Sequence, residues 1–253
     1  MAKVAILVDG GYFLKRLPTI RRDVDRNDPA DVAKAVQQLV RNHLSRLNDI
    51  HGFGSRAIAE ADDRPKSPEF GADTNFYKLL YRTFYYDAPP YEGKGHKPIS
   101  KRPIDHSKTS LAQFRLELHN KLRASPYVAV RLGKVRREGD RTWILREEAQ
   151  KDLLRQRRTV DELVDGDFSL AVRQKGVDMR IGLDIASITL KRQADVIVLV
   201  SGDEDFVPAA KLARREGVQF ILDPLWQNVR PELSEHIDFM TSGFFRPAGN
   251  ARN

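Results

Sequence analysis

The sequence has no cysteine among its 253 residues. This absence excludes disulfide bonds, zinc sites with thiolate ligands and a thiol nucleophile. No stretch approaches the roughly 18 consecutive apolar residues of a membrane-spanning helix. The first residues also lack the apolar region and cleavage pattern of a secretory signal. We therefore expect a cytoplasmic protein that has no contact with a membrane.

Several recurring catalytic patterns are absent as well. The glycines form neither the GxGxxG loop of dinucleotide-binding proteins nor the GxxxxGK[ST] loop of nucleoside triphosphatases. The 6 histidines are scattered and lack the HExxH spacing of zinc hydrolases. We expect single ones such as His43 and His119 on helix surfaces or in satisfied contacts. Neither GxSxG nor SxxK occurs, so the patterns of two classes of serine hydrolase are missing.

Basic residues, by contrast, are in excess. Lys and Arg together number 43 against 35 Asp and Glu, which gives a net charge of +8. Such an excess favours an anionic partner, of which nucleic acid is one class. It is equally compatible with a solvated basic surface, so charge alone does not decide the function.

Continuous apolar runs indicate strands that are buried on both faces. The segments expected to form strands are residues 4–8, 82–90, 127–135, 142–145, 195–200, 218–222 and 237–240. The turn at Gly139-Asp140 predicts that residues 127–135 and 142–145 pair as a hairpin. The aromatic residues of segment 76–86 could form a base-stacking surface, but a helix leading into a core strand is the favoured interpretation.

Apolar residues at spacings of three and four predict amphipathic helices. These helices are expected at residues 12–17, 31–47, 107–122, 178–190 and 207–215, the first of them ending at Pro18. The apolar face of residues 31–47 could serve equally as core or as the interface of a homodimer. Residues 91–106 are basic, contain glycine and proline, and are expected to form an exposed loop.

The order of strands and helices predicts an α/β fold, with a mostly parallel central sheet flanked by helices. We expect one domain over residues 1–245, with insertions near residues 18–30 and 51–74. Residues 246–253 are expected to be a disordered tail.

Aspartates stand at the ends of the two most apolar strands. Asp9 directly follows the first, while Asp203 and Asp205 follow the strand at 195–200. Function in open α/β sheets gathers outside the carboxyl ends of strands. Asp178 opens a helix, and Asp184 lies 1.7 turns further on, so both cannot face one metal equally.

A cation would explain this gathering of acids. Two carboxylates about 4 Å apart repel each other by roughly 4 kcal/mol at an effective dielectric constant of 20. Mg²⁺ or Mn²⁺ would remove this cost, because both take oxygen ligands. Each aspartate also has a simpler interpretation, since Asp178 and Asp205 could cap helices and Asp9 could stabilise a turn.

Four segments together resemble the NYN-domain proteins, in the LabA/DUF88-like branch of the PIN-like nucleases. They are VAILVDGGYFLKR, FYYDAPP, QKGVDMRIGLDIASI and ADVIVLVSGDEDFVPAAKLARREGVQFIL. The resemblance implies a PIN-like three-layer sandwich and metal-dependent cleavage of RNA. It assigns the acidic positions to Asp9, Asp178, Asp203 and Asp205, and it prefers Asp178 to Asp184. Tyr12 stands where many family members have asparagine.

The leading hypothesis is therefore a ribonuclease that depends on Mg²⁺ or Mn²⁺, with RNA favoured over DNA as its partner. The residues expected to contact phosphates are Lys175, Arg180, Lys94, Lys97, Lys101 and Arg102. The main alternative is a non-catalytic nucleic-acid-binding or regulatory module with the same fold. A third hypothesis is a phosphohydrolase of small nucleotides or a DNA nuclease.

Overall fold

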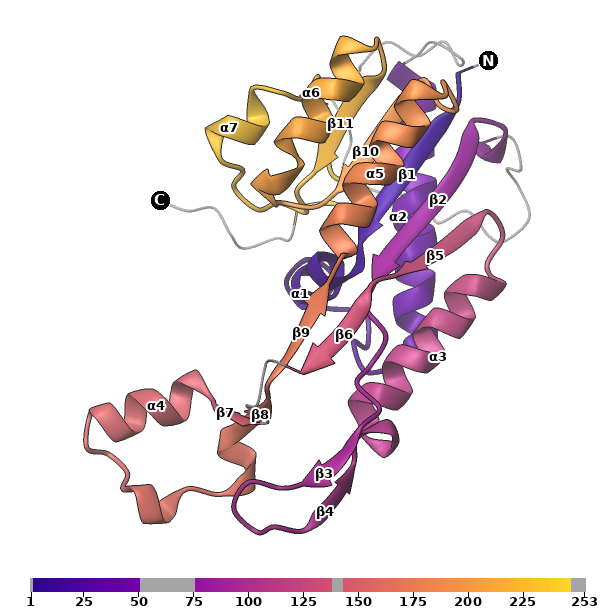
Figure 1. Cartoon of the computed structure of the whole chain (residues 1–253). Coiled ribbons are helices and arrows are strands. Elements are labelled where there is room, and N and C mark those ends of the chain that lie inside the picture. Colours follow the sequence, from indigo (N-terminus) through magenta and orange to yellow (C-terminus); the bar gives the residue numbers. More distant parts are fainter. Residues whose placement is uncertain (1, 51–75, 138–142, 247–253) are drawn as a thin grey trace.

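The computed structural model describes residues 2–50, 76–137 and 143–246 of the chain. Its central sheet has six strands, and every neighbouring pair is parallel (Figure 1). In spatial order they are β12 (Phe239–Met240), β11 (Gln219–Asp223), β10 (Val196–Val200), β1 (Val4–Asp9), β2 (Leu80–Asp87) and β5 (Val128–Leu132). The expected parallel sheet is thus confirmed. The predicted insertion at residues 51–74 and most of the predicted tail lie outside the described residues.

Helices cover both faces of this sheet (Figure 1). The α-helices in the described ranges are α1 (Gly10–Ile20), α2 (Pro29–Ile50), α3 (Ser110–Ala124), α4 (Glu147–Leu154), α5 (Val177–Leu190), α6 (Val207–Arg215) and α7 (Pro231–Ser234). Short 3₁₀ helices are η1 (Phe76–Lys78), η2 (His106–Lys108), η3 (Val160–Glu162), η4 (Asp165–Asp167) and η5 (Glu204–Phe206). No helix in the described parts of the chain is both long and apolar enough to span a membrane.

The side chains of β1 divide the core into two layers. Val4, Ile6 and Val8 pack with residues of α1, α2 and α3, whereas Ala5 and Leu7 pack with residues of α5 and α6. This alternation follows from the two-residue period of a strand, and it explains why β1 is apolar throughout. The three-layer α/β sandwich expected from the sequence is therefore present.

The apolar face of residues 31–47 is buried within this chain. Val36, Leu39 and Leu44 on α2 are completely inaccessible and belong to the core cluster around β1. This face therefore serves as core. The aromatic residues of β2 are core residues too, because Tyr85 and Tyr86 are fully buried. The favoured interpretation of that segment is confirmed.

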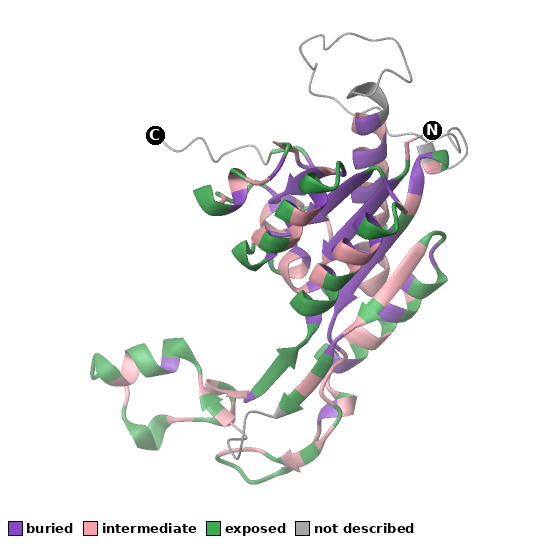
Figure 2. Cartoon of the chain, turned by 45° about the horizontal axis from the view of Figure 1, so that its top comes forward, coloured by how far each residue is buried: buried purple, intermediate pink, exposed green. Residues whose placement is uncertain are grey.

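A second part of the molecule, here called the arm, extends away from the sheet and comprises residues 91–106, 134–137 and 143–175 (Figure 1). It contains three short antiparallel pairs, and Figure 2 shows it as mainly exposed or half-exposed. The pairs are β3 (Lys94–His96) with β4 (Pro103–Asp105), β6 (Lys134–Arg137) with β9 (Val172–Lys175), and β7 (Trp143–Leu145) with β8 (Phe168–Leu170). Residues 91–106, expected to be a loop, thus include one strand pair.

The predicted hairpin between residues 127–135 and 142–145 is wrong. Gly133 divides the first segment into β5 and β6, and β6 and β7 pair with different, more distant strands. A Cβ atom at position 133 would lie 2.8 Å from both the carbonyl oxygen of Lys175 and Cγ2 of Val177. Only glycine permits this approach of β9, and the local sequence around the turn does not reveal the partner.

Two helix predictions also need correction. Helix α1 continues beyond Pro18 to Ile20, since a proline in the last turn removes one hydrogen bond without ending the helix. In α5, the apolar stripe predicted for residues 178–190 includes Met179, Leu183 and Leu190, but these side chains are 71%, 63% and 62% exposed. The residues that are buried on α5 are Val177, Ile181, Ile185, Ile188 and Thr189.

Two buried aspartates at strand ends bind histidines. Asp223 at the end of β11 lies 2.8 Å from Nε2 of His43 and accepts the N–H groups of Leu225 and Gly243. Asp87 at the end of β2 lies 2.9 Å from Nε2 of His119 and also accepts from Arg115. Both histidines are buried, so the helix-surface alternative is wrong. Each contacts its aspartate through Nε2, but Nδ1 of His43 is buried without a hydrogen-bond partner in the described residues, so the expected satisfied contact holds for that ring only in part.

We predict that Asp223→Ala lowers the free energy of unfolding by about 3–5 kcal/mol, because it leaves His43 and two backbone N–H groups without their buried acceptor. Urea denaturation followed by circular dichroism measures the change. Asp161→Ala, at an exposed position, is the control and should change stability by no more than about 0.5 kcal/mol. A loss below about 1 kcal/mol for Asp223→Ala would contradict the assigned role.

Candidate active site

The direction of the chain reverses between β1 and β10, at the centre of the sheet. After β1 the chain moves outward to β2, whereas after β10 it moves outward to β11 on the other side. The carboxyl ends of two such strands form a crevice that open α/β proteins use for binding. Asp9 ends β1, and Ser201, Gly202 and Asp203 follow β10 directly.

Asp9 is held in place from both sides of this crevice. Its Oδ1 accepts the backbone N–H of Tyr12 at 3.0 Å, which caps helix α1, and its Oδ2 accepts the hydroxyl of Ser201 at 3.3 Å. Burial raises the pKa of the Asp9 carboxyl to about 6, and the nearby Asp178 carboxylate adds to the rise. Asp9 therefore does stabilise the turn into α1, as one interpretation predicted, but this role does not explain why its carboxylate is placed where burial disfavours the charge.

The other three aspartates lie around Asp9 with more solvent access. Oδ1 of Asp203 accepts the N–H of Asp205 at 3.0 Å, and the N–H of Asp203 donates to Ser201, which links it to Asp9. Asp178 is in the first turn of α5, after Gly176 at φ 76°. Burial raises the pKa of Asp178, and the charges of Asp203 and Asp205 raise it further. The structure thus brings Asp178 within electrostatic range of the other three acids, and hydrogen bonds through Ser201 and the backbone connect Asp9, Asp203 and Asp205.

The donor set suits a hard cation that keeps part of its water shell. Within residues 2–50, 76–137 and 143–246, no three His, Asp or Glu side chains lie close enough to hold a metal ion by themselves. In the same ranges none of the four aspartates forms an ion pair with Lys or Arg. Mg²⁺ retains several waters and binds through one or two carboxylates, so these residues fit such an ion in their chemistry.

Asp184, the rival of Asp178, is engaged elsewhere. It accepts the Tyr86 hydroxyl at 2.8 Å and lies 3.4 Å from Nε of Arg131. The carboxylate also raises the pKa of Tyr86, after the larger effect of burial. Asp184 therefore connects α5 to β2 and β5, one and a half turns or more from the acidic crevice.

Tyr12 supports the crevice through its backbone and its ring. Its hydroxyl donates to the carbonyl of Pro224, just after β11. A Cβ atom at Gly202 would lie 2.9 Å from the Tyr12 hydroxyl oxygen, so the ring packs directly on the loop after β10. Burial raises the pKa of the hydroxyl, which therefore stays protonated at neutral pH. Tyr12 is a packing residue here and offers no amide oxygen to a ligand.

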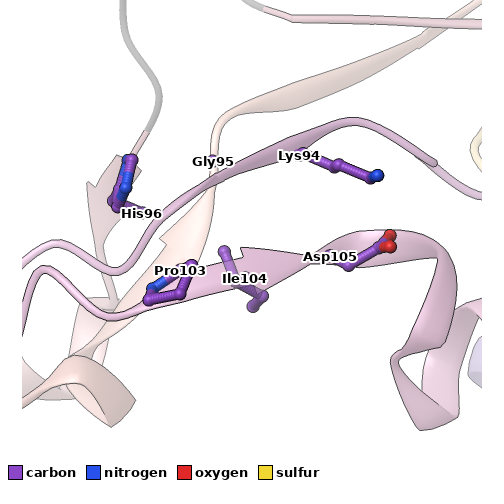
Figure 3. Close-up of a pocket in the computed structure, with 6 residues that line it drawn as sticks. All are labelled: Lys94, Gly95, His96, Pro103, Ile104 and Asp105. Carbon is purple, nitrogen blue, oxygen red and sulfur yellow. The ribbon is translucent and has the colours of Figure 1, made fainter.

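The predicted phosphate-contacting residues fall into two groups. Lys175 and Arg180 are exposed and flank Asp178, at the end of β9 and in the first turns of α5. Lys94, Lys97, Lys101 and Arg102 lie on the arm, in and between β3 and β4. Lys94 lines an open hollow of the β3–β4 pair with His96, Ile104 and Asp105 (Figure 3). The structure thus does not gather the two groups at one point.

Sequence reasoning missed Ser201, which joins Asp9 and Asp203. It also passed over Asp87 and Asp223, although FYYD and FILD end in aspartate as VAILVD does. The apolar-run-plus-aspartate signal could have found both. Their partners distinguish them from the four acids of the crevice, because each contacts a buried histidine, His119 on α3 or His43 on α2.

We predict that Asp9→Asn stabilises the metal-free protein at neutral and higher pH. The folded state favours the protonated carboxyl, so the cost is absent below about pH 4 and grows as the pH rises to about 6. The full cost is about 3 kcal/mol, and asparagine can still cap α1. Thermal melts of both proteins in EDTA at pH 4.5 and pH 8 measure it. Equal melting temperatures at pH 8 would refute the buried charge.

Part of the chain matches a known family model, and a solved structure aligns with the chain. A search of the curated proteins found no match. A solved structure, a protein of unknown function (VPA0982) from Vibrio parahaemolyticus RIMD 2210633, aligns with 16% identity and a TM-score of 0.41, over 96% of this chain and 95% of that chain. The mixed α/β architecture with its parallel sheet is consistent with a PIN-like fold. Residues 118–234, which include Asp178, Asp203 and Asp205, match the model of the NYN domain, a family of PIN-like nucleases.

Proposed function

We propose that this protein is a divalent-metal-dependent ribonuclease. The observation that carries the proposal is the group of Asp9, Asp178, Asp203 and Asp205 at the crevice between β1 and β10. Burial and the charges of neighbouring acids raise the pKa values of Asp9 and Asp178, and none of the four acids has a basic ion-pair partner among the described residues. Carboxylates with raised pKa values are concentrated at functional sites. The NYN match and the net charge of +8 favour a nucleic acid as the substrate.

The four acids have different parts in this proposal. Asp9 is the rigid member, because Tyr12 and Ser201 fix both of its oxygens while leaving lone pairs available. Asp178, Asp203 and Asp205 are more exposed and orient waters and the scissile phosphate. A Mg²⁺ or Mn²⁺ ion, when bound, supplies Lewis acidity toward the phosphate and lowers the pKa of water. The carboxylates hold that ion, chiefly through water.

Hydrolysis of the backbone joins the oxygen of a water molecule to phosphorus and breaks one bridging P–O bond. Asp9 has its pKa near 6, which suits a carboxylate that holds a proton briefly at neutral pH. The proton leaves the attacking water and reaches the departing oxygen or the solvent.

A second candidate is a nucleic-acid-binding module without catalysis. The observation in its favour is that no three candidate ligands converge within the described residues. In this case the protein binds RNA in the presence and absence of Mn²⁺, and cleavage does not occur.

We predict that Asp203→Asn lowers RNA cleavage by at least about 100-fold, more than the loss typical of a group beyond the metal ligands. Asparagine preserves the cap on η5, so the fold should be unchanged. The assay incubates purified protein with end-labelled single-stranded RNA, single-stranded DNA or mononucleotides in Mn²⁺, Mg²⁺ or EDTA. Asp161→Asn, an exposed acid on the arm, is the matched control and should retain full activity.

The different substrates and metal conditions of this assay separate the candidate functions. Cleavage of RNA that needs the metal and Asp203 supports the proposal. Preferential cleavage of DNA or of mononucleotides would replace RNA by another substrate. Binding of RNA without cleavage in any metal supports the non-catalytic module, and full activity of Asp203→Asn would eliminate the acidic site.

A further inference from the structure

The ribbon formed by β6 and β9 carries four basic residues on one face. The register places Lys134 opposite Lys175 and Arg136 opposite Arg173. Residues directly opposite in an antiparallel pair share a face, and so do residues two apart along a strand. We call Lys134, Arg136, Arg173 and Lys175 the cationic ladder. Its two rungs lie two residues apart, roughly 7 Å along the ribbon.

This face is unfavourable for the isolated protein. Like charges placed directly opposite each other destabilise a strand pair, and a lone two-stranded ribbon has little stability to spare. Lys134, Arg136 and Lys175 are exposed, and none of them pairs with a carboxylate in the described residues. Several acids elsewhere on the arm have partners of their own, as Asp167 pairs with Arg158 and Asp165 accepts a hydrogen bond from Ser100.

The ladder faces away from the core. Val135 lies between Lys134 and Arg136 on β6, so its side chain is on the opposite face, where it packs against the core cluster of α5 and α6. Gly133 at the base of the ribbon is buried, and its N–H donates to the carbonyl of Asp87 at 2.7 Å. The base of the ribbon is therefore fixed to the sheet, and the ladder is held toward solvent.

The ladder leads directly to the acidic crevice. Lys175 ends β9, and Asp178 follows three residues later in the first turn of α5. Gly176 turns the chain between them, with φ 76°. Figure 1 shows that β9 runs directly into α5. A strand of phosphates that lies along the ladder is therefore led toward Asp178.

We propose that the cationic ladder binds the phosphate backbone of a nucleic-acid strand and delivers it to the acidic crevice. The inference rests on the proposed function for the destination of the strand. The binding itself requires only the charges on the ribbon. A polyanion is complementary in charge to this face: it removes the repulsion between Lys134 and Lys175 and releases its own counterions.

The outer part of the arm gives a contrast. Between Glu147 and Asp167 the arm carries seven acidic residues against four basic ones: Glu147, Glu148, Asp152, Asp161, Glu162, Asp165 and Asp167 against Lys151, Arg155, Arg157 and Arg158. A polyanion is repelled there and attracted to the ribbon. The strand therefore follows the ladder face, and the outer segment supplies basic residues for a control.

The double variant Lys134→Gln with Arg136→Gln tests the inference. Fluorescence anisotropy measures its binding to a labelled single-stranded RNA in EDTA, so that cleavage has no influence. Loss of two phosphate contacts should weaken binding on the order of 10-fold at 0.15 M salt and make the slope of log K against log salt shallower by about 1.4. Single-stranded DNA of the same sequence should show a similar loss, because the contacts are to phosphates.

The control is Arg155→Gln with Arg157→Gln, which removes the same charge from the exposed end of α4 and should leave the affinity and the slope unchanged. The ladder variant should melt at the same temperature as the parent protein or higher, since it removes like-charge repulsion. This result excludes a loss of binding through unfolding.

The outcomes separate this inference from the proposed function. A loss of binding in the ladder variant supports the inference even if the parent protein cleaves no RNA. If the parent cleaves RNA while the ladder variant binds both polymers with unchanged affinity and slope, the inference is overturned and the ribonuclease proposal stands. An equal loss of affinity in the two double variants would mean that net charge alone causes the effect, and this result would also overturn the inference.

Discussion

The parallel pairing of β1 with β10 is the constraint on which the rest of the site depends. Its register runs from Val4 opposite Val196 to Val8 opposite Val200, across 192 residues of sequence. Both strands are buried on both faces, so a shift by one residue would exchange core layers and is strongly disfavoured. Because the register is fixed by packing, the residues just past each strand end must meet. The hydrogen bond between Ser201 and Asp9 is the direct result.

The molecule keeps two unfavourable groups of like charge close together in sequence. Negative charges gather around Asp178, and positive charges gather on the ribbon that ends at Lys175. The two groups do not neutralise each other through ion pairs in the described residues. Both lie on elements that are held by packing, namely Val135 for the ribbon and the buried face of α5 for Asp178. Hydrophobic burial therefore stabilises an arrangement of charges that would not form on its own.

The sequence allowed prediction of the features that depend on local pattern. The apolar runs of β1 and β10 identify these strands because a strand buried on both faces is apolar throughout, and the spacing in α2 and α3 identifies these helices because burial of one face imposes a period of 3.6. The carboxylates at the ends of β1 and β10 follow from the same pattern. The pairing of β6 with β9 could not be predicted, since it rests on the close approach at Gly133 and on strands more than 30 residues apart.

The remaining errors arise where tertiary contacts override local signals. The apolar spacing of α5 includes Met179 and Leu183, but only one side of the helix faces the sheet, and both lie on the other. The apolar runs before Asp87 and Asp223 resemble the one before Asp9. Histidines from distant helices decide that these two carboxylates are structural. In each case the deciding partner is far away in sequence.

The close ends of the β6–β9 ribbon have a consequence for how the chain can change through evolution. Lys134 and Lys175 face each other across one strand pair, so the chain leaves the sheet and returns to it at nearly the same point. The 40 residues between Lys134 and Lys175 can be lengthened, shortened or replaced without changing the order of strands in the sheet. Insertions are best tolerated where the two ends of the inserted segment lie close together. The residues that this segment presents to a ligand can therefore change while the strands that position the acidic crevice stay the same.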